Sequence, residues 1–319
     1  MSDRAEKVGV LVMAYGTPRT PEEIEPYYTD IRRGRPPTPE LLGELVERYA
    51  AIGGVSPLAQ LTEAQRDAIQ STLDEIEPGR FVTGLGLKHA DPKVEAGAAA
   101  LVADGCDQVV GVVLAPHESS YSIGQYLDRA QSGIDETGAE VPMAGIRSWA
   151  IEPAFIDFLT SEVEQRRARM RLDLDAAGRS GAIRVVFTAH SLPTRIVEGG
   201  DPYAGELRST AEAVAERLEL TEGADWQIGW QSAGRTPEPW IGPDILEVVD
   251  ELGADPTVDG VIVSSCGFVA DHLEVLYDLD IETKQRADEV GLAFDRTASV
   301  DADPVVMGAL ARRVAALAD

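Results

Sequence analysis

The stretch VGVLVMAYGTP at residues 8–18 decides the fold class, and IRVVFTAHSLP at residues 183–193 repeats its pattern. In each stretch, a run of β-branched and other apolar residues leads into a polar turn and a proline, and Tyr15 falls opposite His190. A continuous apolar run is typical of a strand that is covered on both faces of a parallel sheet. The two stretches therefore predict equivalent strands in two similar halves.

Further apolar runs alternate with amphipathic windows, and the run at residues 109–117 resembles that at residues 258–268. Strands are expected at residues 8–14, 81–87, 109–115, 183–189, 226–229 and 258–263. Helices are expected at residues 39–51, 62–77, 92–104, 123–136, 153–174, 203–220 and 304–318. This alternation predicts an α/β fold with parallel sheets.

The repeat predicts two Rossmann-like domains, residues 1–148 and 149–302, and a C-terminal helix at residues 303–319 that is expected to pack on the first domain. The first domain contains a long segment, residues 19–80, that has no equal in the second. Ligands of open α/β sheets bind beyond the carboxyl ends of the strands. We therefore expect the two halves to enclose an interdomain cleft.

The chain of 319 residues is strongly acidic, with 55 Asp and Glu against 28 Lys and Arg and a formal net charge of −27. This balance argues against general binding to nucleic acid or to an anionic membrane, so an anionic ligand needs a local basic patch. An acid-rich, lysine-poor surface suits a salty cytosol, where screening weakens self-repulsion. No apolar run approaches the ~18 residues of a helix that spans a membrane. The polar residues 1–7 before the first strand are too short for a signal or transit peptide. We expect a cytoplasmic protein without membrane insertion.

All four histidines follow strand-like runs: His89, His117, His190 and His272. A single histidine at a strand end is more often a hydrogen-bonded structural residue than a catalyst. Four histidines in such places favour a cleft that serves proton transfer, metal binding or both.

A row of carboxylates follows the last of these strands, at Glu274, Asp278 and Glu282. One interpretation is a solvated acidic face, which is common in so acidic a protein. The alternative is an oxygen-lined track for a divalent cation, with His190 as the softer ligand at its end. Because a spacing of four drifts around a regular α-helix, we predict a local π-turn that brings the three carboxylates closer to one line.

Arginines cluster at Arg32, Arg33 and Arg35, within the unmatched segment. They can compensate the C-terminal dipole of a helix. They can also clamp a polycarboxylate ligand, because a guanidinium pairs bidentately with a carboxylate. Nucleotide binding is disfavoured, because neither a G-x-G-x-x-G motif after a strand nor a Walker lysine is present.

The chain contains several distinctive short motifs: AYGTP at 14–18, YYTDIRRGR at 27–35, RYAAIGGVSPL at 48–58, GLKH at 86–89, LAPH at 114–117, AHSLP at 189–193, GDPY at 200–203 and GFVADHLEVLYD at 267–278. Together they resemble the ferrochelatase family, most closely the coproporphyrin III ferrochelatases of bacterial haem synthesis. The resemblance implies two Rossmann-like, chelatase-type domains with a porphyrin cleft between them, and a porphyrin lip at about residues 19–60.

The resemblance also implies roles for individual residues. His190 and Glu274 are implied as the catalytic pair at the metal-insertion site, and Asp278 and Glu282 as the continuation of the metal path. The implied porphyrin contacts are Tyr15, Arg32, Arg48, Tyr49, Ser56 and Tyr126, with Tyr15 also a ligand for product iron, and Lys88 and His89 line the cleft.

The implied activity is that of a lyase that inserts Fe²⁺ into coproporphyrin III to give coproheme, with no cofactor beyond its substrate iron. Alternatives are a protoporphyrin IX ferrochelatase, another tetrapyrrole chelatase such as one for cobalt, and a non-catalytic carrier of haem or metal. The charged lip at residues 22–40 favours the tetracarboxylate substrate. A [2Fe-2S] cluster needs four ligands and is not expected, because Cys106 and Cys266 are the only cysteines. The expected partners are porphyrin and Fe²⁺, bound by a monomer.

Overall fold

The computed structural model describes residues 6–234 and 236–319. Backbone contacts divide the chain into two compact units. Unit 1 comprises Met1–Trp149 and Asp301–Asp319, and unit 2 comprises Ala150–Val300. Each unit is an α/β structure, as predicted.

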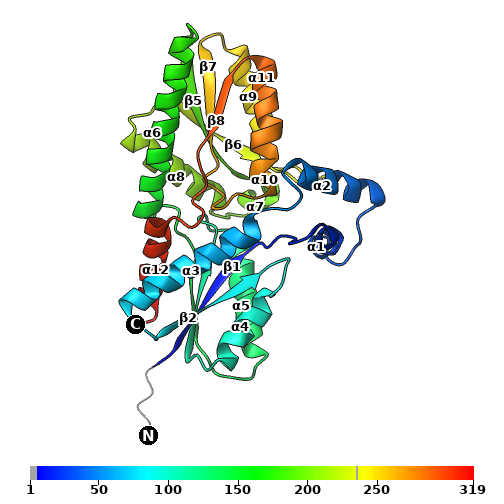
Figure 1. Cartoon of the computed structure of the whole chain (residues 1–319), viewed down its shortest axis with the longest axis vertical. Coiled ribbons are helices and arrows are strands. Elements are labelled where there is room, and N and C mark those ends of the chain that lie inside the picture. The colour runs from blue at the N-terminus through cyan, green and yellow to red at the C-terminus, as the bar shows by residue number, and fades with distance from the viewer. Residues whose placement is uncertain (1–5, 235) are drawn as a thin grey trace. The chain divides into compact units, whose positions relative to one another are not determined.

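The described part of unit 1 contains one parallel four-stranded sheet (Figure 1). Its strands are β1 (Val8–Ala14), β2 (Phe81–Leu87), β3 (Gln108–Val113) and β4 (Met143–Ile146), in the order β2-β1-β3-β4. Its helices are η1 (Pro21–Glu23), α1 (Ile24–Ile31), α2 (Pro39–Ala51), α3 (Leu58–Ile76), α4 (Val94–Ala103), η2 (Ser120–Gly124), α5 (Gln125–Asp135) and α12 (Pro304–Leu317). The pair α4 and α5 covers one face of the sheet, and the pair α3 and α12 covers the other.

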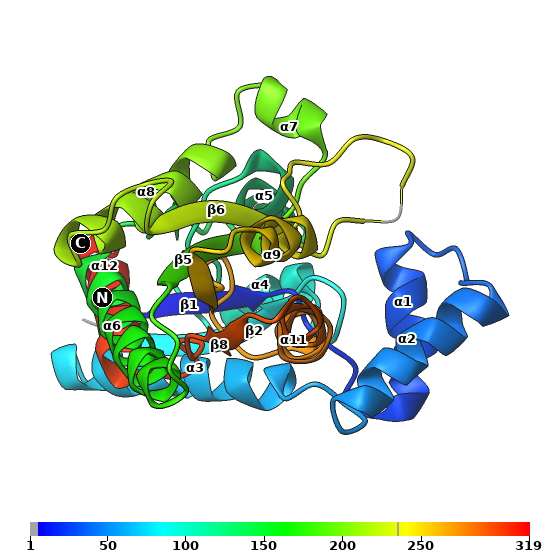
Figure 2. The ribbon, with the colours of Figure 1, turned by 90° about the horizontal axis from the view of Figure 1, so that it is seen from above.

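The described part of unit 2 has the same plan. Its strands are β5 (Ala182–His190), β6 (Trp226–Gln231), β7 (Val258–Ser264) and β8 (Ala293–Arg296), in the order β6-β5-β7-β8. Its helices are α6 (Pro153–Ala176), α7 (Thr194–Glu198), α8 (Tyr203–Arg217), α9 (Ile245–Ala254), α10 (Leu273–Leu276), η3 (Asp278–Thr283) and α11 (Lys284–Val290). In Figure 2, α8 lies beside β6 and α11 beside β8; α6 and α8 pack together, as do α9 and α11.

The equal strand order of the two sheets confirms the predicted internal repeat. Strands β1 and β5, which carry the two matching stretches, hold the same inner position and have parallel neighbours on both sides. Every residue of β1 is buried, as expected for a strand that is covered on both faces.

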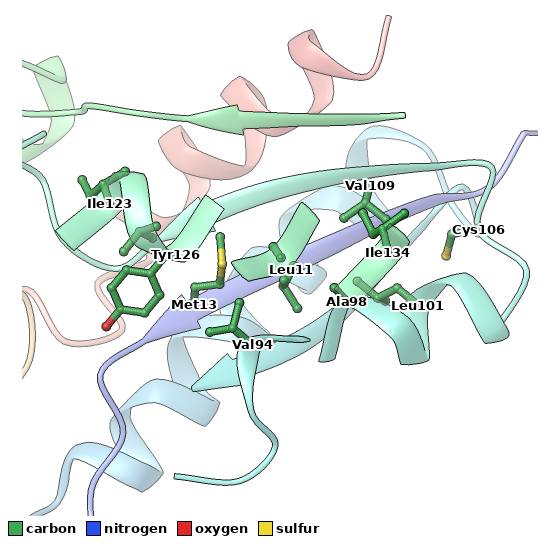
Figure 3. Close-up of a cluster of buried hydrophobic side chains, with 12 residues drawn as sticks. Leu11, Met13, Val94, Ala98, Leu101, Cys106, Val109, Ile123, Tyr126 and Ile134 are labelled. Carbon is green, nitrogen blue, oxygen red and sulfur yellow. The ribbon is translucent and has the colours of Figure 1, made fainter. Parts of the chain in front are cut away.

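The core of unit 1 forms where β1 meets α4 and α5 (Figure 3). Leu11 and Met13 share one buried cluster with Val94 and Tyr126. The backbones approach closely, because a Cβ atom at Gly97 of α4 would lie 2.1 Å from the carbonyl oxygen of Leu85.

The sequence did not predict the edge strands β4 and β8 or the helices α1, α9 and α11. Each edge strand has only four residues, too few for a periodic signal. In the described ranges, no helix combines the length and the apolar character required to cross a membrane.

Candidate active site

The carboxyl ends of β5 and β7 in unit 2 bring the predicted catalytic residues together. His190 is the last residue of β5, and Glu274 lies in α10, which follows a loop from β7. That loop is pressed onto the end of β5, since a Cβ atom at Gly267 would lie 2.3 Å from Cβ of Ala189. The close approach of the loop directs the chain after it toward His190.

His190 and Glu274 face each other, with 3.8 Å between Nε2 and Oε2 and about a third of each side chain exposed. Nδ1 of His190 lies 2.5 Å from the carbonyl oxygen of Ser191. A carbonyl oxygen only accepts hydrogen bonds, so Nδ1 must donate. Nε2 of the neutral ring therefore presents its lone pair toward Glu274, which leaves it ready to bind a metal ion or a proton.

A second imidazole lies near the same carboxylate oxygen. Nε2 of His272 lies 3.7 Å from Oε2 of Glu274, and Nδ1 donates to the carbonyl oxygen of Ala270 at 3.0 Å. Two nitrogen lone pairs and a carboxylate oxygen thus meet at one place. Since all three are acceptors, this arrangement attracts a proton.

His272 is one of the four strand-end histidines, but it was not among the predicted site residues. Its position two residues before Glu274 in the motif DHLE was the available signal.

Three aromatic side chains, one of them a tyrosine, lie near the two histidines. The rings of His272 and Phe268 have centroids 4.7 Å apart, and Trp240 lies 6.3 Å from His190. The hydroxyl of Tyr203 donates to the carbonyl oxygen of His190 at 3.1 Å. Phe268 packs against the ring of His272, and Tyr203 holds the backbone of His190; none of these three aromatic residues was among the predicted site residues.

The element after Glu274 is a π-helix over Asp278–Thr283, which confirms the predicted widening. Asp278 is buried, and its Oδ2 accepts a hydrogen bond from the Ser232 hydroxyl at 2.5 Å, whereas Glu282 is exposed. The three carboxylates of the row therefore have different surroundings, and the idea of a uniformly solvated acidic face is wrong at Asp278.

Within residues 6–234 and 236–319, no group of three or more His, Cys, Asp or Glu side chains is arranged to hold a metal ion. Among the four residues predicted as metal ligands, the geometry pairs His190 with Glu274, while Asp278 and Glu282 lie farther along the same segment.

In unit 1, Tyr15 follows β1 and is exposed, and its ring centroid lies 4.6 Å from that of His89. Nδ1 of His89 lies 2.7 Å from Asp30 Oδ2, and Nζ of Lys93 lies 3.0 Å from Asp30 Oδ1. Burial lowers the pKa of His89. Burial opposes ionisation of Asp30, but the hydrogen bonds from His89 and Lys93 outweigh it and lower the pKa of this carboxyl. Asp30 thus joins α1 to the ends of β2 and α4.

Lys88 lies beside Tyr126, with Nζ 5.4 Å from the centroid of the ring. Burial, helped by the nearby positive charge of Arg129, lowers the pKa of Lys88 to about 8. Burial raises the pKa of Tyr126, which belongs to the core cluster. Lys88 therefore loses its proton more readily than an exposed lysine.

The other predicted porphyrin contacts differ in exposure. Arg32 is the C-cap residue of α1, with its guanidinium 5.5 Å from the ring centroid of Tyr28. Arg48 is half-buried. Tyr49 is buried, with its hydroxyl 3.5 Å from that of Thr17, and the buried Ser56 hydroxyl accepts from the Leu58 amide at 3.2 Å. Because both side chains are buried, Tyr49 and Ser56 stabilise the local structure of the segment that follows β1.

His117 is fully buried, and burial lowers its pKa to about 3. Its ring is neutral at any physiological pH. This histidine therefore fits the role of a buried structural residue, which is the more common one for a single histidine at a strand end.

A family profile described as Ferrochelatase matches residues 7–317 of the chain. The chain belongs to the ferrochelatase family. It is therefore a lyase of the ferrochelatase type, and the resemblance stated from its motifs is confirmed.

Curated relatives of this ferrochelatase match it over nearly the whole length. The coproporphyrin III ferrochelatase of Halalkalibacterium halodurans is 44% identical over 307 residues, 96% of each chain. That of Bacillus subtilis is 42% identical over 307 residues, again 96% of each chain.

Solved structures of SirB from Bacillus subtilis share the fold. The structure with Fe³⁺ matches with a TM-score of 0.52 at 14% identity and covers 97% of this chain and 94% of SirB. The sirohydrochlorin chelatase SirB from subspecies spizizenii, in complex with cobalt, matches with a TM-score of 0.54 at 11% identity over the same shares. At such identity the likeness concerns the chelatase fold alone.

Proposed function

We propose that this ferrochelatase inserts Fe²⁺ into coproporphyrin III and so produces coproheme in haem biosynthesis. The relatives at 42–44% identity that carry the name coproporphyrin III ferrochelatase support this substrate. The observation that carries the proposal is the distance of 3.8 Å between Nε2 of His190 and Oε2 of Glu274. Metal insertion needs both a metal ligand and a base, and these two groups can supply them.

The reaction makes two demands on the site. The porphyrin must lose its two pyrrolic protons, and Fe²⁺ must exchange water for the pyrrole nitrogens. Because Nδ1 of His190 donates to Ser191, the lone pair of Nε2 is directed outward as the first metal ligand or the first proton acceptor. Glu274 is its acidic partner in either role, and the charges of the two groups are coupled.

His272 extends this pair. With its own Nε2 lone pair toward Glu274, it provides a second acceptor for a proton that leaves the carboxyl group. We propose that Asp278 and Glu282 supply oxygen ligands along the path by which the metal arrives.

Unit 1 supplies the residues proposed to hold the porphyrin. Arg32 and Arg48 are placed in the segment after β1, where guanidinium groups suit the carboxylates of a coproporphyrin. Tyr15 presents an exposed phenol, which suits contact with the macrocycle and ligation of product iron. Binding at the ring edge supplies the free energy to distort the planar ring, so that its nitrogen lone pairs point out of the plane.

The test is an anaerobic incubation of the purified protein with coproporphyrin III and Fe²⁺, followed through the absorption bands of the metal-free porphyrin. Loss of these bands with turnover supports the proposal. Binding without turnover would instead indicate a carrier. Parallel reactions with protoporphyrin IX, and with Co²⁺ and sirohydrochlorin, test the alternative chelatases, and faster turnover with either would contradict the proposed substrate.

The remaining expectations form part of the same proposal. We propose that the two units are the Rossmann-like domains of a cytoplasmic monomer that needs no cofactor beyond its substrate iron. Sedimentation of the purified chain tests the monomer, and metal analysis of the protein before addition of iron tests for a cluster.

A further inference from the structure

Arg296, the last residue of β8, holds two aspartates that flank the proposed catalytic carboxylate. Its Nε donates to Oδ1 of Asp280 at 2.6 Å, and its Nη2 to Oδ2 of Asp280 at 2.9 Å. The same guanidinium lies 3.2 Å, through Nη1, from Oδ1 of Asp271. Only 13% of the Arg296 side chain is exposed, whereas 27% of Asp271 and 38% of Asp280 are exposed, so the guanidinium is shielded from water and the two carboxylates are partly solvated.

The two aspartates stand on opposite sides of Glu274 in the chain. Asp271 precedes α10, and Asp280 lies in the π-helix η3 that follows it. The hydroxyl of Ser299 also donates to Oδ1 of Asp271 at 2.7 Å. Arg296 therefore fastens both ends of the segment 271–280 to the end of β8.

The middle of this segment is fastened from β6. The side-chain amide of Gln231 donates to the carbonyl oxygen of Glu274 at 2.9 Å, and the Ser232 hydroxyl donates to Asp278. With both ends held by Arg296, the segment has little freedom to move Glu274 away from His190.

We propose that Arg296 is a positioning residue for metal insertion, whose bridge between Asp271 and Asp280 keeps Glu274 opposite His190. This inference rests on the proposed function. A planar guanidinium with five donors is needed for the bridge, because it pairs bidentately with one carboxylate and still reaches another. A lysine ammonium keeps the charge but cannot reproduce that geometry. Misplacement of a reacting group by about 1 Å is enough to cost ~100-fold in rate.

The test compares Arg296→Gln and Arg296→Lys with the control Arg286→Gln. Arg286 also pairs with two acids, Asp250 and Glu289, but it is 40% exposed on α11 and bonds neither Asp271 nor Asp280. The Gln variants remove the same charge. Measurements are kcat, KM for Fe²⁺ and Kd for coproporphyrin III.

We expect Arg296→Gln to lower kcat/KM for Fe²⁺ by about tenfold or more while Kd for the porphyrin stays within about twofold. Arg296→Lys should recover only part of this loss, and Arg286→Gln should match the parent. Full recovery by Arg296→Lys, or an equal loss in porphyrin binding, would overturn the proposal. If Arg296→Gln does not fold, Asp280→Asn gives the same readouts, because it breaks the bidentate half of the bridge.

Hydrogen exchange separates this inference from the proposed function. Amides of residues 271–280 should exchange faster in Arg296→Gln than in Arg286→Gln, and this difference should not depend on whether coproporphyrin III is a substrate. If the parent does not metallate coproporphyrin III, the proposed function fails while faster exchange still supports the fastening. If the exchange of these amides is unchanged in Arg296→Gln, the proposed role of Arg296 is overturned.

Discussion

Nε2 of His190 lies 3.8 Å from Oε2 of Glu274, although one residue ends β5 and the other follows β7. The two strands are neighbours in the sheet of unit 2, so their carboxyl ends lie at the same edge. The pair is thus a direct consequence of the sheet order. It is also the arrangement on which the predicted chemistry depends.

Replacing His190 by alanine should abolish metal insertion and leave porphyrin binding intact. The imidazole contributes a metal ligand or a base, and the loss of such a group typically costs about 100-fold or more in rate. Turnover with Fe²⁺ and the Kd for coproporphyrin III, from fluorescence quenching, are the two measurements. Near-normal turnover would refute the assignment of His190.

Replacing Arg32 by alanine should mainly weaken porphyrin binding, by about tenfold, because one charge-assisted hydrogen bond to a carboxylate is lost. Arg66→Ala is the matched control, since Arg66 pairs with Asp67 in α3. The tetramethyl ester of the porphyrin should bind the parent and Arg32→Ala equally. A change in kcat alone would contradict the carboxylate clamp.

Replacing Asp30 by asparagine should loosen α1 from the rest of unit 1. The change removes the ion pair with Lys93 and the charge that His89 faces. Because Asp30 is 40% exposed, the loss of stability should stay at or below about 1 kcal/mol. Limited proteolysis after α1 should become faster, with Asp67→Asn as control. Its lowered pKa means that this contribution is present above pH ~4 and is lost as the pH falls further.

His117 should make the protein less stable as the medium is acidified. Its pKa is about 3 in the folded state and about 6.5 in the unfolded chain. Above pH ~6.5 both states are neutral, whereas below it only the unfolded state takes up the proton, which costs about 1.4 kcal/mol per pH unit. Urea unfolding between these values should show a shallower pH slope for His117→Asn than for the parent. Equal slopes would be incompatible with a neutral buried ring.

Added KCl should raise the unfolding temperature. The chain carries a formal net charge of −27, and its self-repulsion is screened as the Debye length falls from ~10 Å at 0.1 M salt to ~3 Å at 1 M. Thermal melts across this range test the effect, with sucrose at equal osmolality as the non-ionic control. A midpoint that does not rise with KCl would remove the idea of adaptation to a salty cytosol.

Much of the fold was predictable because its signals are local. The apolar runs that became β1 and β5 have no alternation, and this already requires cover on both faces of a sheet. The edge strands β4 and β8 were missed because four residues carry too little periodicity. The π-helix at Asp278–Thr283 was predicted on the hypothesis that Glu274, Asp278 and Glu282 form one row, which a regular α-helix would not keep in line.

By itself, the sequence determined the α/β class, the repeat and the family motifs, and through the resemblance it named His190 and Glu274 as candidates, which the neighbouring strands β5 and β7 then bring together. Only the tertiary structure decided that His272 shares the Glu274 carboxylate, that Tyr49 and Ser56 are buried, and that Arg296 fastens Asp271 and Asp280. Such contacts join side chains from separate strand ends and loops. Their existence depends on strand order and on the path of each loop, which no local pattern of residues encodes.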